Sequence, residues 1–344
     1  MKRLLKQVAG IDVAQKELVV SLGRMYDDLA PELYGFKTFA NTAKGFEALL
    51  QWAKKRSDVS MGVHYVMEAT GVYHESLAYF LDSQGCELSI VLPNKISNYT
   101  RTLEVKTITD KTASGTIARF GLERRLDRWT RPKPVFKRLR QLTREREQVI
   151  ASRTRVKNLL HAELAEAEPN EGSVDRIGQQ IALFDQQEQA IQAEIEALVK
   201  GDEQARHSIK LLCSIPGVGV LTAVTVLAET NGFELIRNKR QLTSYAGLDV
   251  QDKQSGTSVK AKPRISKKGN KYLRKAMHFP ALGAIRSDER FKAIFTRLVA
   301  RHGIKMKAVV AVQRTLLEMI YTIFKSQIAY DKTYLQRARQ SLKN

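Results

Sequence analysis

The sequence predicts an α/β domain, an antiparallel helical hairpin and a mainly α-helical third domain. Three observations favour this architecture. Strand-like and helix-like segments alternate over residues 1–125, two charged segments with heptad-spaced apolar residues follow, and helical runs joined by glycine-rich turns continue beyond them. A length of 344 residues accommodates two or three domains of roughly 100–200 residues each. We therefore expect domains at residues 1–128, 129–208 and 209–344.

The first domain is predicted to open with a β-hairpin. Residues 7–13 and 17–22 are short apolar runs on either side of a three-residue turn. A helix follows the N-cap candidate Thr42, because apolar residues then recur at helical spacing. The next expected elements are a strand at residues 62–67, a helix at 73–82 and a strand at 87–92 that ends before Pro93.

A linker and a helical hairpin are predicted next. Two prolines in residues 129–134 interrupt the pattern, and two heptad segments follow on either side of a break at residues 168–172. Arg146 and Arg153 fill gaps in the first heptad series. Basic residues at seam positions are costly for packing alone, so these arginines either space the helices or contact a nucleic-acid backbone.

The charge balance indicates a polyanionic partner. Lys and Arg number 57 against 36 Asp and Glu, which leaves a formal net charge of +21. Nucleic acid is the commonest polyanion that proteins bind, and each neutralised phosphate adds salt-dependent affinity. Solubility alone would also explain an excess of cations, but the clustering described below favours a binding role.

Cysteine usage and hydropathy exclude several protein classes. Cys86 and Cys213 are the only cysteines, which excludes a disulfide framework and a CxxC metal motif. The basic start of the chain is not followed by an apolar run, so no signal peptide is expected. No segment approaches the roughly 18 apolar residues of a membrane helix. A cytoplasmic protein without a membrane partner is predicted.

Three acidic residues of the first domain are candidate metal ligands. Asp12 and Glu68 end predicted strands, and Asp110 begins a predicted helix. A carboxylate beside an apolar strand is costly unless it is paired or bound to a cation. Each acid alone could be a surface or capping residue. Together, within an α/β frame, they are similar to the Mg²⁺ or Mn²⁺ site of RNase-H or RuvC-like nucleases, where metal ions assist phosphodiester cleavage.

The turn at residues 214–219 is a candidate phosphate contact in the third domain. Its sequence, SIPGVG, lies between two apolar helical runs and is similar to a helix-hairpin-helix turn. Gly217 and Gly219 would let the backbone approach a phosphate near a helix N-terminus. A purely structural turn between two packed helices is the alternative.

The strongest basic cluster surrounds Ser255. No acid occurs between Lys253 and Lys275, and the segment begins with small, hydroxyl-bearing residues. Nearby cations would stabilise both a serine alkoxide and the transition state of attack on a phosphate. The alternative is a flexible loop that only bends the chain. The candidate nucleic-acid-binding residues of this cluster are Lys260, Lys262, Arg264, Ser266, Lys267, Lys268, Lys271 and Arg274.

These features together resemble one family. The chain is similar to insertion-sequence transposases related to the Piv pilin-gene invertases, a group that includes the bridge-RNA-guided recombinases. The resemblance spans nearly the whole chain, and its motifs occur in the family's order. They are Gly10-Ile11-Asp12, Glu68-Ala69-Thr70-Gly71, Thr109-Asp110, the 214–219 turn, Tyr245-Ala246-Gly247-Leu248, Ser255-Gly256 and Arg264-Ile265-Ser266-Lys267-Lys268-Gly269.

The resemblance implies a RuvC-like domain with four acids (DEDD), a coiled coil and a C-terminal transposase domain. It assigns Asp12, Glu68 and Asp110 as metal ligands and Ser255 as the nucleophile. It further implies homodimers or homotetramers on donor and target DNA duplexes, with a noncoding bridge RNA as guide. Insertion, excision and inversion are equally compatible with it.

The chain departs from this pattern at the fourth acid. The family carries a second aspartate three residues after the first, and this sequence has Ala113 at that position. An alanine offers no oxygen ligand, so a natural or engineered loss of cleavage is expected. Three functions therefore remain open: a serine recombinase, a metal-dependent nuclease, junction resolvase or invertase without an RNA guide, and a nucleic-acid-binding protein without catalysis.

Overall fold

The chain folds into two compact units, Met1–Arg131 and Pro132–Asn344. A computed structural model describes residues 2–69, 71–103, 109–234, 236–252, 254–255, 259–260 and 264–333. The predicted proline-rich break at residues 129–134 lies at the boundary between the units. The helical hairpin is part of the second unit, and a separate domain boundary near residue 208 stays a prediction.

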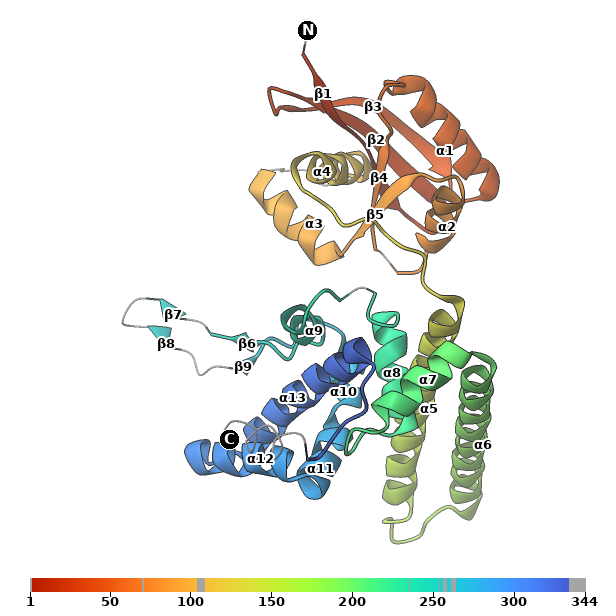
Figure 1. Ribbon diagram of the computed structural model, residues 1–344. Helices are drawn as coiled ribbons and strands as arrows, with labels where there is room; N and C mark the ends of the chain where they lie inside the picture. The colour runs from red at the N-terminus through yellow and green to blue at the C-terminus, as the bar shows by residue number, and fades with distance from the viewer. Residues whose placement is uncertain are drawn as a thin grey trace, which may run out of the picture. The chain divides into compact units, whose positions relative to one another are not determined.

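The first unit contains a five-stranded mixed sheet of order β3-β2-β1-β4-β5 (Figure 1). Strands β1, β2 and β3 are antiparallel neighbours, whereas β4 and β5 run parallel to β1. The predicted β-hairpin and the α/β class of this domain are confirmed; β3 was not predicted. The strands are β1 (Leu4–Val13), β2 (Glu17–Tyr26), β3 (Pro31–Ala40), β4 (His64–Glu68) and β5 (Glu87–Val91).

Helices cover both faces of this sheet (Figure 1). Ala9, Ile11 and Val13 of β1 pack in the core formed with α1 and α2. Val8, on the opposite face, packs with residues of α3 and α4. The helices are α1 (Ala43–Arg56), α2 (Glu75–Ser83), α3 (Pro93–Thr100), a 3₁₀ turn η1 (Arg101–Leu103) and α4 (Asp110–Glu123).

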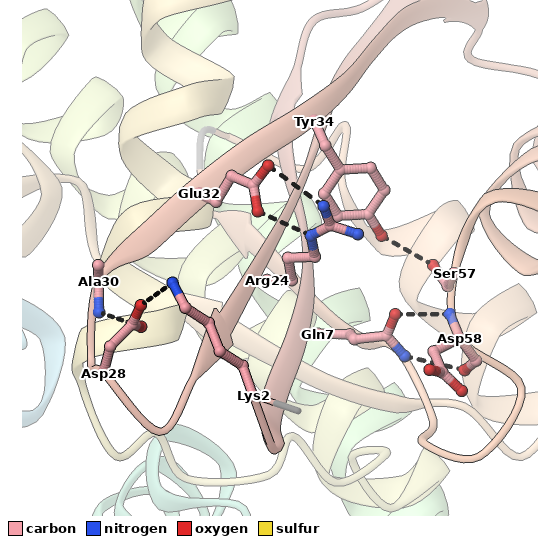
Figure 2. Close-up of polar contacts among 9 residues, drawn as sticks. All are labelled: Lys2, Gln7, Arg24, Asp28, Ala30, Glu32, Tyr34, Ser57 and Asp58. Carbon is pink, nitrogen blue, oxygen red and sulfur yellow. Dashed lines mark hydrogen bonds and ion pairs between the residues drawn. The ribbon is translucent and has the colours of Figure 1, made fainter.

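Polar contacts join the strands and a neighbouring loop away from the carboxyl end of β1 (Figure 2). The buried Gln7 side chain donates to Asp58 O at 3.0 Å and accepts from Asp58 N at 2.7 Å. Arg24 forms two hydrogen bonds with Glu32 across β2 and β3, at 2.8 and 3.2 Å. These contacts lie toward the beginning of β1, whereas Asp12 lies near its end.

The second unit begins with two long antiparallel helices, α5 (Pro134–Glu163) and α6 (Glu171–Gly201). Their direction follows from their ion pairs, because Arg138 pairs with Glu194 and Arg153 pairs with Asp185. The antiparallel hairpin is therefore present, and its supercoiling as a coiled coil stays a prediction.

Short elements and packed helices complete the second unit. Its core includes the apolar face of the final long helix, where Val312, Leu316 and Ile320 are fully buried. None of the described helices combines the length and apolar composition needed to cross a bilayer. The elements are α7 (Glu203–Leu212), α8 (Val220–Thr230), α9 (Lys239–Tyr245), β6 (Val250–Gln251), β7 (Gln254–Ser255), β8 (Val259–Lys260), β9 (Arg264–Ile265), α10 (Lys271–Ala276), α11 (His278–Ser287), α12 (Glu289–His302) and α13 (Lys305–Ser326).

Candidate active site and nucleic-acid interface

Strand alternation places Asp12 and Glu68 on one face of the sheet. Successive side chains of a strand point to opposite faces, and Val8 and Val66 face α4. Asp12 lies four residues after Val8, and Glu68 lies two residues after Val66, so both acids project toward the α4 face. The parallel register pairs Ile11 with the residue before Glu68, which makes the two acids neighbours at the carboxyl ends of β1 and β4.

Helix α4 brings Asp110 to the same face. The helix lies unusually close to β1 at Gly10, where an added Cβ would meet the backbone nitrogen of Ala118 at 2.2 Å. The Ser21 and Ser114 hydroxyls are also hydrogen-bonded at 2.8 Å between β2 and α4. Asp110 is the first residue of the helix, so this close packing holds it near the strand ends.

The start of α4 is held by a capping box. Thr109 Oγ1 accepts from Thr112 N at 3.3 Å, and Thr109 N donates to Thr112 Oγ1 at 2.7 Å. Such reciprocal bonds satisfy backbone donors that a helix leaves free in its first turn. Asp110 is therefore held in place both by the capping box of α4 and by the packing of α4 on the sheet.

The three acids interact electrostatically. Burial, followed by the negative charges of Asp110 and Glu68, raises the pKa of the half-buried Asp12. This repulsion is what a bound cation would relieve, and carboxylate oxygens suit Mg²⁺ or Mn²⁺. Within the described ranges, however, no three His, Cys, Asp or Glu side chains meet closely enough to hold a metal ion. The acids share a face, and the metal site itself stays a prediction.

Ala113 lies one helical turn after Asp110 and is partly buried. Its backbone N–H donates to Thr109 O at 2.8 Å, inside the capped first turn. The side chain at this position contributes a methyl group and no oxygen. The position at which the resemblance expects a fourth acid therefore lies in the first turn of α4, and the role of that position stays a prediction.

Asn41 is a site-adjacent residue that sequence reasoning missed. Its Nδ2 donates to Ala14 O at 2.9 Å and to Tyr73 O at 3.2 Å. Ala14 lies two residues after Asp12, and Tyr73 lies five residues after Glu68, so one amide joins the segments that follow both acids. An Asn between a strand and a helix N-cap gives no such signal in the sequence.

Ser255 lies in a short antiparallel hairpin of the second unit. Its backbone belongs to β7 and pairs with Val259 of β8, while Lys260 pairs with Gln254. The structure describes the backbone of Ser255 and Lys260, and Lys262 lies outside the described residues. The nucleophile and phosphate-binding assignments of these three residues stay predictions.

Two motifs that are distant in sequence meet at the base of this segment. Lys267 N donates to Gly247 O at 3.1 Å, and Asn270 N donates to Tyr245 O at 2.7 Å. Gly247 has φ +66°, and an added Cβ there would meet Lys267 backbone atoms at 3.0 Å, so a side chain would disturb this contact. The Tyr245–Leu248 and Arg264–Gly269 motifs of the resemblance are therefore one packed unit.

The candidate nucleic-acid-binding residues of this segment divide into engaged and exposed groups. Ser266 Oγ donates to Asp249 at 2.6 Å, and Arg274 donates to Ala246 O at 2.8 Å, so both have roles within the fold. The remaining described cations point to solvent and are free to meet a phosphate without first breaking an ion pair. They are Arg264, Lys267, Lys268 and Lys271.

A buried carboxylate anchors the base of the basic segment. The Glu229 side chain in α8 is 0% exposed and accepts two hydrogen bonds from Arg144 of α5, at 2.7 and 2.8 Å. It also accepts from Asn270 Nδ2 at 2.6 Å, and its backbone oxygen accepts from the Tyr245 hydroxyl at 3.0 Å. Asn270 in turn caps α10 through Leu273 N. Glu229 thus joins the long hairpin to the end of the basic segment, a role that sequence reasoning missed.

The SIPGVG turn joins α7 to α8, as predicted. Gly217 has φ +82°, and an added Cβ would meet Pro280 O at 2.3 Å, so this glycine allows close packing against α11. Gly219, at the N-cap of α8, has no atom within 4 Å of an added Cβ. Close packing against α11 explains why residue 217 is a glycine. The surface at Gly219 is open, as a phosphate contact would require.

Arg146 and Arg153 are engaged within the hairpin. Arg146 pairs with Glu188 of α6 at 2.5 Å, and Arg153 contacts both Asp185 and Glu188. These contacts account for basic residues at seam positions without a nucleic acid. A phosphate would have to compete with two carboxylates, so the predicted nucleic-acid role of these arginines is less favoured by the geometry.

Comparisons with known proteins match two segments of the chain, and the first of them continues past the boundary between the units into α5. Residues 9–169 match a transposase family of the DEDD IS110 type, and residues 209–296 match the transposase IS116/IS110/IS902 family. The chain is 28% identical to the pilin gene-inverting protein of Moraxella bovis, over 95% of this chain and 98% of the relative. The chain belongs to the IS110-type transposases and invertases.

A second curated relative and one solved structure are also similar to the chain. The Moraxella lacunata pilin gene-inverting protein is 29% identical over 86% of this chain and 90% of its own length. The solved structure of T. thermophilus RuvC in complex with a Holliday junction substrate matches 33% of this chain and 92% of that chain, with a TM-score of 0.26 and 11% identity. As a member of the IS110-type family, the chain is an enzyme of the transposase and DNA recombinase class.

Proposed function

We propose that this IS110-type enzyme cuts and rejoins DNA through Ser255, assisted by a divalent cation at Asp12, Glu68 and Asp110. The observation that supports the proposal is that the three acids lie on one face, where burial, followed by the charges of Asp110 and Glu68, raises the pKa of Asp12. Mg²⁺ or Mn²⁺ bound there would stabilise negative charge on the scissile phosphate. We propose Mg²⁺ as the ion, cleavage chemistry like that of RuvC, and a cytoplasmic location for the protein.

The proposed cleavage step is a transesterification. Ser255 Oγ forms a bond to the scissile phosphorus while the bond from phosphorus to one deoxyribose oxygen breaks. The serine proton leaves with a base or with solvent, and the released oxygen is protonated to a hydroxyl. Exchange follows when a hydroxyl of another strand attacks the phosphoserine, which re-forms a phosphodiester and restores the serine.

The exposed cations of the basic segment would hold the DNA backbone during this step. Arg264, Lys267, Lys268 and Lys271 are exposed and follow Ser255 in sequence. Each phosphate that they neutralise adds salt-dependent affinity. We further propose donor and target duplexes as substrates, a noncoding bridge RNA as guide, and a homodimer or homotetramer as the active assembly.

Covalent trapping tests the serine mechanism. Ser255→Ala should abolish both cleavage of duplex DNA and the DNA–protein adduct that survives denaturing electrophoresis, whereas Ser258→Ala in the same segment should retain both. Cleavage by the Ser255→Ala variant at the unmodified rate would instead establish a metal-dependent nuclease or resolvase. Sequencing the RNA that copurifies with the chain tests guidance, and full activity of RNA-free protein would exclude it.

We also propose that Ala113 impairs cleavage in this chain. Ala113→Asp adds a carboxylate one turn after Asp110, and strand cleavage in Mg²⁺ should rise tenfold or more. Ala113→Asn supplies an oxygen without the charge and should restore less activity. Equal rates for the unmodified chain and the aspartate variant would show that three acids suffice. DNA binding without cleavage in all three proteins, in Mg²⁺ and Mn²⁺, would favour a binding protein.

A further inference from the structure

A second cationic surface lies at the corner between α12 and α13. The sequence contains no acid between Glu289 and Glu318. The exposed cations of this stretch flank the α12–α13 turn, with Arg297 and Arg301 on α12 and Lys305 and Lys307 at the start of α13. We call these four residues the corner cations.

The corner cations are not neutralised within the unit. Among the ion pairs of the described residues none involves them, and the pair on α12 between Lys292 and Glu289 lies at the other end of that helix. Burial, and then the positive charges of Lys307 and Arg301, lowers the pKa of His302 between them. The charges at this corner therefore crowd one another.

The turn brings these charges close together along the chain. Arg297 and Arg301 are spaced i, i+4, so they lie on one side of α12. Gly303 then adopts φ +69° and ends the helix. Lys305 and Lys307 lie in the first turn of α13, where the helix dipole disfavours positive charge. Positive charges gathered at a helix N-terminus repel one another and the helix dipole. A bound polyanion would neutralise them.

Apolar side chains are exposed among the cations. Ile304 is 57% exposed and Met306 is 58% exposed, and both alternate with the lysines of the corner. A surface of cations with interspersed apolar side chains suits the alternating phosphates and sugars of a nucleic-acid backbone.

We propose that the α12–α13 corner is a second nucleic-acid-binding surface that contacts phosphodiester backbone. The inference deepens the proposed function and rests on it, because it adds a binding surface outside the Ser255 segment. The chemistry is shared by duplex DNA and structured RNA. The apolar residues would contact sugars or unstacked bases, and the corner cations would contact phosphates.

Charge reversal tests the surface against a matched control. The double variant Lys305→Glu with Lys307→Glu changes the charge at the corner, and Lys200→Glu with Lys210→Glu changes two exposed lysines of α6 and α7 by the same amount. Acids in the first turn of α13 suit the helix dipole, so the corner variant should unfold at no lower temperature than the unmodified chain. Both variants are full-length chains assayed without added metal, which separates binding from cleavage.

The expected result is specific to the corner. Affinity for a 30-base-pair duplex of arbitrary sequence, or for an RNA hairpin, should fall tenfold or more in the corner variant. The slope of log affinity against log salt should fall by about 2, since two phosphate contacts are lost. The control should keep the slope of the unmodified chain. Loss in the DNA arm alone or the RNA arm alone identifies which nucleic acid the corner contacts.

Three outcomes would overturn the proposal. Equal weakening in both variants would show that overall charge, and no local contact, sets affinity. Unchanged binding of both nucleic acids would show that the corner does not contact them. Unchanged nucleic-acid binding with lost binding to vesicles of anionic phospholipid would assign the corner to a lipid surface. Because no readout depends on cutting, failure of the Ser255 mechanism leaves these outcomes distinct.

Discussion

The two halves of the proposed site are positioned in different ways. In the first unit, backbone geometry places the acids, since strand alternation directs Asp12 and Glu68 and a helix start supplies Asp110. In the second unit, side chains perform this task, since the buried Glu229 joins Arg144 and Asn270 at the base of the basic segment. The first half should therefore be sensitive to packing volume and the second to the loss of single polar groups.

The largest expected effect is at Glu229. Glu229→Ala leaves Arg144 and Asn270 without their buried acceptor and should lower the free energy of unfolding by about 3 kcal/mol. Denaturant unfolding of the full chain, followed by circular dichroism, measures the change. Glu147→Ala is the control, because its partner Lys275 is exposed and the expected loss is about 1 kcal/mol or less. Similar losses in the two variants would contradict a special role for Glu229.

A smaller effect is expected at Gly10. Gly10→Ala drives a methyl group into the backbone of α4 and should cost about 1–3 kcal/mol, because the helix must move away from β1. Displacement of α4 also moves Asp110, so stabilisation of the chain by added Mn²⁺ should fall. Gly62→Ala meets nothing within 4 Å and should change the free energy of unfolding by less than about 0.5 kcal/mol. An unchanged Mn²⁺ response in Gly10→Ala would argue against positioning by packing.

The smallest effect is expected in the hairpin. Arg153→Met removes contacts to Asp185 and Glu188 and should lower the stability of the chain only slightly. The salt dependence of DNA binding should stay the same, because the guanidinium is occupied within the hairpin. The exposed Arg155→Met is the matched control for charge. If the slope of log affinity against log salt fell by about 1 for Arg153→Met and stayed unchanged for the control, Arg153 would be shown to contact the nucleic acid.

The sequence predicts the first half of the site better than the second. Strand ends and a helix N-cap are local signals, so the sequence predicts where Asp12, Glu68 and Asp110 lie in their strands and helix, and the structure confirms these places. The edge strand β3 escaped prediction because most of its residues are partly or fully exposed and its apolar alternation is weak. Regular alternation is the main sequence signal of a strand with one buried face.

The second half depends on contacts between distant residues. Arg144 and Glu229 are 85 positions apart, and Glu229 and Asn270 are 41 apart, so no local pattern reveals their link. Arg146 and Arg153 show a different difficulty. Their cationic character leaves helix spacing and a phosphate contact equally open, and only the structure shows that their contacts lie on the neighbouring helix. The identity of a charged residue is visible in the sequence, and its partner is not.

Ala113 has a consequence for the stability of the metal-free chain. An acid in its place would add a fourth negative charge beside three carboxylates that already repel one another, whereas alanine is the residue most favourable to a helix interior. Alanine at this position therefore makes the metal-free fold easier to maintain than an acid would. Catalytic sites commonly sacrifice stability for chemistry, and the first turn of α4 avoids that cost at this position.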